Sequence, residues 1–65
     1  MEAIDIWRAA KVLIDRYGDG AASEAARRIA EQQSNGDFAG AAIWGQIHAA
    51  IGKLQAPLSA GEKAN

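Results

Sequence analysis

The chain has 65 residues, of which 7 are basic and 8 acidic, and it contains no cysteine and one histidine. A chain of this length forms at most one domain and buries only about 60% of its unfolded surface, so it is marginally stable unless something reinforces it. The composition excludes disulfides and thiolate metal sites, and the balanced charge gives no strong field that would attract nucleic acid or an anionic membrane.

The first predicted element is an amphipathic helix over about residues 3–17. Apolar side chains recur at helical spacing on one face, and charged side chains group on the opposite face. Gly18 is expected to end the helix, because glycine adopts left-handed backbone angles without a Cβ penalty. The predicted inward face consists of Ile6, Trp7, Ala10, Leu13, Ile14 and Tyr17.

A second helix is predicted over residues 20–34, with Asp19 as its N-cap. Glu24 with Arg28, and Arg27 with Glu31, are four residues apart on the outer face, where such pairs contribute only about 0.2 to 0.5 kcal/mol each. The inward face is made of small side chains that allow a neighbouring helix to approach closely, namely Ala22, Ala25, Ala26 and Ile29.

The sequence Ser34-Asn35-Gly36-Asp37 predicts a tight connection to a third helix over residues 37–55. Asn35 or Gly36 closes the second helix and Asp37 caps the third, so the two helices form an antiparallel hairpin. Pro57 is expected to prevent the third helix from continuing.

These elements predict an all-α, antiparallel three-helix domain over residues 1–56, followed by a flexible tail over residues 57–65. The inward faces of the three helices are expected to meet in one core. Its predicted members are Trp7, Leu13, Ile29, Trp44, Ile47 and Ile51.

The third helix carries a second face, opposite the core, which we call the small-residue face. Glycine inside a helix lowers helix stability by about 0.8 to 1.0 kcal/mol relative to alanine. The two glycines on this face are therefore expected to serve another purpose, such as close approach of a second helix. We interpret the face as an interface with another helix, with drift at a tolerant surface as the alternative. Ile4 and Val12 of the first helix are expected to add apolar area to it. The small-residue face consists of Phe38, Ala41, Ala42, Gly45, Ala49 and Gly52.

No catalytic, cofactor-binding or metal-binding residue is predicted. His48 is the obvious general base for an enzyme, but no acid on its own helix is placed to orient it and no cysteine is present to activate. Arg27 and Arg28 are interpreted as partners of acidic residues on the same helix rather than as phosphate ligands, since the third helix offers no arginine to a nucleic acid.

Several segments resemble a family of very small bacterial proteins of unknown function. The resemblance covers most of the chain and implies a bacterial context, without any reaction or catalytic residue. The residues that carry it are the run from Ile6 to Asp15, Tyr17-Gly18-Asp19, Ala25-Ala26-Arg27-Arg28, and Gly36-Asp37 with Gly40, Ala42, Trp44, Ile47, Ala50 and Leu54.

The function expected from these features is a non-catalytic protein-interaction or self-assembling helical module, most simply a homodimer. A small nucleic-acid-associated regulator is the alternative, and an enzyme or ligand-binding protein comes third. No cofactor is expected. The acidic N-terminus lacks the basic and apolar regions of a secretory signal. The longest uncharged stretch, Phe38 to Gly52, is too short to cross a membrane. The predicted location is therefore the cytoplasm.

Overall fold

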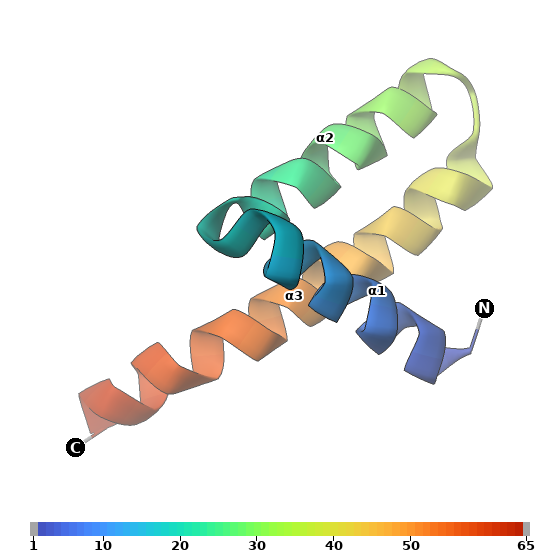
Figure 1. The fold of residues 1–65 in the computed structure, drawn as a ribbon. Coiled ribbons are helices and arrows are strands. Elements are labelled where there is room, and N and C mark those ends of the chain that lie inside the picture. The colour runs from blue at the N-terminus through green and yellow to red at the C-terminus, as the bar shows by residue number, and fades with distance from the viewer. Residues whose placement is uncertain (1, 65) are drawn as a thin grey trace.

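The computed structural model describes the backbone of residues 2–64 and the side chains of residues 2–55. Three helices pack together, which confirms the all-α prediction (Figure 1). They are α1 (Ala3–Tyr17), α2 (Ala21–Ser34) and α3 (Phe38–Ala64), and a short 3₁₀ turn, η1 (Gly18–Gly20), joins α1 to α2.

The two later helices form an antiparallel hairpin, and α1 lies across it (Figure 1). The α2–α3 connection combines two backbone hydrogen bonds with a side-chain cap. The Gly36 amide donates to the Gln33 carbonyl at 3.0 Å and the Asp37 amide donates to the Gln32 carbonyl at 2.8 Å, which is the Schellman arrangement, with φ of 76° at Gly36. Oδ1 of Asp37 then accepts from the Gly40 amide at 2.9 Å. The predicted roles of Gly36 and Asp37 are therefore confirmed.

The α1–α2 junction differs in part from the prediction. Gly18 ends α1 with φ of 55°, as predicted. Asp19 does not cap α2, because it lies inside the 3₁₀ turn and the residue before the helix is Gly20, which has φ of −86° and ψ of 0° instead of the extended angles of a capping residue. Nε2 of Gln55 donates to the Gly18 carbonyl at 3.1 Å, so this junction is tied to α3.

The core lies where α1 crosses the hairpin. The predicted core members Leu13, Ile47 and Ile51 are buried in it, and Trp44 packs against it while partly exposed. Among the residues whose side chains the structure describes, the buried members of this cluster are Ile6, Ala10, Leu13, Ala21, Ala25, Ile47, Ala50 and Ile51.

Trp7 is a correction to the predicted core, since 39% of it is exposed. Because α1 crosses α3 instead of running along it, only a narrow line of α1 touches the hairpin. Trp7 is about 100° around the helix from Ile6 and lies at the edge of that line. Ile29 is also outside the cluster and half-buried, one turn beyond Ala25 toward the hairpin turn.

The backbone of α3 is helical to Ala64 instead of ending near Gln55. A proline removes one backbone hydrogen bond, but the residues after it remain able to adopt helical angles, so Pro57 does not by itself stop the helix. The side chains of residues 56–65, and with them the prediction of a flexible tail over 57–65, lie outside the described residues. Within the part that the structure describes, no helix has the length and apolar character to cross a membrane.

We predict that Gly40 and Asp37 are coupled in stability. A Cβ on Gly40 would lie 2.5 Å from Oδ2 of Asp37, so alanine at this position displaces the capping carboxylate. Loss of such a cap costs about 0.5 to 2 kcal/mol, which offsets the gain of about 1 kcal/mol from replacing a helical glycine. Gly40→Ala is therefore expected to give no net stabilisation in the parent, but about 1 kcal/mol in an Asp37→Ala background. Urea denaturation measures both, and equal effects in the two backgrounds would contradict the coupling.

Candidate functional site

The structure divides the predicted interface residues into exposed and buried ones. Exposed fractions are 70% for Phe38, 59% for Ile4 and 51% for Val12. Gly45 is half-buried. The remaining exposed members of the small-residue face are Ala42, Ala49 and Gly52.

Ala41 is a correction, because it is only 6% exposed and belongs to the interior of the domain. It lies one turn before Trp44 on α3. The guanidinium carbon of Arg28 in α2 lies 5.0 Å from the centroid of the Trp44 ring, so this flank of α3 is the one that α2 covers. From here on, the small-residue face means Phe38, Ala42, Gly45, Ala49 and Gly52.

A shallow depression of about 260 Å³ lies between the first half of α1 and the middle of α3. Trp7 forms part of its wall, and Ala49, which is exposed, belongs both to its lining and to the small-residue face. The depression therefore continues the small-residue face toward α1. Its lining residues are Ala3, Ile6, Trp7, Gln46, Ala49, Ala50 and Lys53.

Sequence reasoning missed this depression because it assigned Trp7 to the core. A signal was present in the sequence, since Trp7 lies at the margin of the apolar face of α1 and Ile4 is one turn away on the same side. Val12, by contrast, is five residues from Trp7 and thus about 140° around the helix. It does not line the depression.

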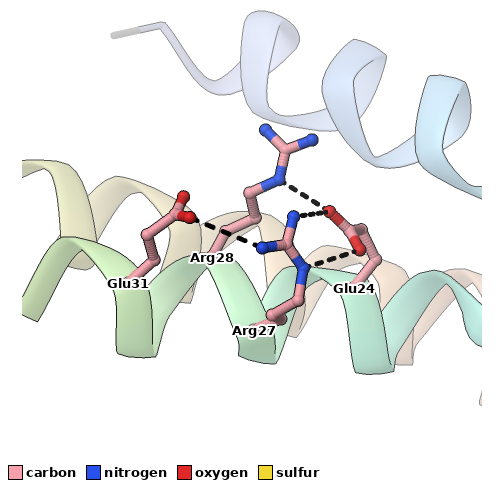
Figure 2. A network of polar contacts seen from close by, with 4 residues as sticks. All are labelled: Glu24, Arg27, Arg28 and Glu31. Carbon is pink, nitrogen blue, oxygen red and sulfur yellow. Dashed lines mark hydrogen bonds and ion pairs between the residues drawn. The ribbon is translucent and has the colours of Figure 1, made fainter.

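Four charged residues of α2 form a network of hydrogen bonds and ion pairs (Figure 2). Glu24 accepts from both Nε and Nη2 of Arg27, at 3.1 and 2.7 Å, and from Nε of Arg28 at 2.7 Å. Arg27 also reaches Glu31 at 3.5 Å. Both predicted pairs therefore exist, but the close partner of Arg27 is Glu24 instead of Glu31.

The network changes the charge behaviour of Glu24. Its side chain is 14% exposed, and hydrogen bonds first from Arg27 and then from Arg28 lower its pKa from 4.5 to about 2. The same carboxylate raises the pKa of both guanidinium groups. Arg28 is held between this carboxylate and the face of Trp44, so the network fastens α2 to α3 and the arginines have structural partners.

The remaining candidate from the sequence is the single histidine. His48 is exposed on α3. Over the described residues, no group of three or more His, Cys, Asp or Glu side chains is arranged to hold a metal ion.

No family model, curated protein or solved structure matches the chain. The resemblance to very small bacterial proteins therefore stays a prediction.

Glu24→Gln is expected to lower the free energy of unfolding at neutral pH. Because the folded pKa of Glu24 is lowered, its charge contributes stability above about pH 4.5, and this contribution is lost as the pH falls toward about 2. The difference in stability between the parent and the variant should therefore shrink over that interval in a series of urea titrations. Glu31→Gln is the matched control, and its effect at neutral pH should be smaller because the 3.5 Å pair is exposed. A Glu24→Gln difference that is the same at neutral pH and near pH 2 would contradict this assignment.

Proposed function

We propose that the protein is a non-catalytic helical module that binds polypeptides, and in the first place binds itself as a homodimer. The observation that carries this proposal is the position of Ala49. It joins the small-residue face to the depression beside Trp7, so that two apolar surfaces form one continuous surface along α3 and α1. The cytoplasm and a bacterial source are part of the same proposal.

The area of the small-residue face shows which further side chains a dimer interface would need. The stretch from Phe38 to Gly52 is about 22 Å long and roughly 10 Å wide, at 1.5 Å per residue and the usual helix diameter. That is well below the ~800 Å² that each partner contributes to a standard interface. The small side chains alone are therefore too little, and the exposed apolar side chains Trp7 and Ile4 have to contribute.

The charge of this surface favours a protein partner over nucleic acid. No residue from Phe38 to Gly52 carries a formal charge at neutral pH. Arg27 and Arg28, the adjacent basic pair, are engaged by Glu24. A nucleic-acid-associated regulator needs free cations that reach phosphates, so this alternative has less support.

The proposal predicts that the parent chain is a dimer by light scattering and that Ala49→Arg shifts it toward the monomer. Arginine is tolerated at an exposed helical position, but here it places a long charged side chain in the middle of the apolar surface. Gly45→Gln should act in the same way, since among described residues nothing lies within 4 Å of a Cβ at Gly45 and the monomer accepts the side chain.

Ala30→Arg is the matched control, because Ala30 is an exposed alanine of α2 outside this surface. It should keep the mass of the parent. A parent that is monomeric at high concentration, or an Ala49→Arg variant that remains a dimer, would show that the surface does not mediate self-association.

A further inference from the structure

We draw no further inference here: the strongest candidate, the shallow depression between α1 and α3 that Trp7 and Lys53 line, continues an unpartnered apolar face, and nothing in the structure shows what covers it.

Discussion

Close packing of helices through alanine is the constraint on which the rest of the structure depends. Among the described residues, nine apolar side chains are buried, five of them are alanines, and Ile51 is the largest that is fully enclosed. Alanine allows two helix backbones to approach closely and loses no side-chain entropy on burial. It also hides little apolar surface, so a domain built this way gains contact without gaining much hydrophobic stabilisation.

The two tryptophans show the consequence. Trp44 lies on the flank of α3 that α2 covers, and Arg28 closes over its ring at 5.0 Å. Trp7 lies on α1, which crosses the hairpin, and its outward side is left open at 39% exposure. Tryptophan therefore packs against the core at position 44, whereas at position 7 it forms the wall of a shallow depression because α1 crosses the hairpin there.

The helices and their hairpin turn were predictable because their signals are local. Gly36 and Asp37 act through hydrogen bonds to residues at most five positions away, and Gly18 needs only its own backbone angles. The two misplaced residues, Trp7 and Ala41, depend instead on how much of a helix its neighbours cover, which no local pattern encodes. Trp7 lies at the edge of the line where α1 crosses the hairpin, and Ala41 lies on the flank of α3 that α2 covers. Periodicity tells which residues share a face and leaves open how wide a part of that face the neighbouring helix covers.

The polar network lies beside Trp44 and the depression lies beside Trp7, and the two tryptophans are covered differently. On the side of α2, a carboxylate that is 14% exposed orders two guanidinium groups, and one of them covers an aromatic ring. Charge-assisted hydrogen bonds there replace the large apolar contacts that alanine does not provide. On the side of α1, Lys53 lines the depression, and the described ion pairs are all within α2, so no comparable polar cover forms over Trp7. An aromatic side chain without a polar cover of its own is left partly open to water, and this is the physical difference between Trp7 and Trp44.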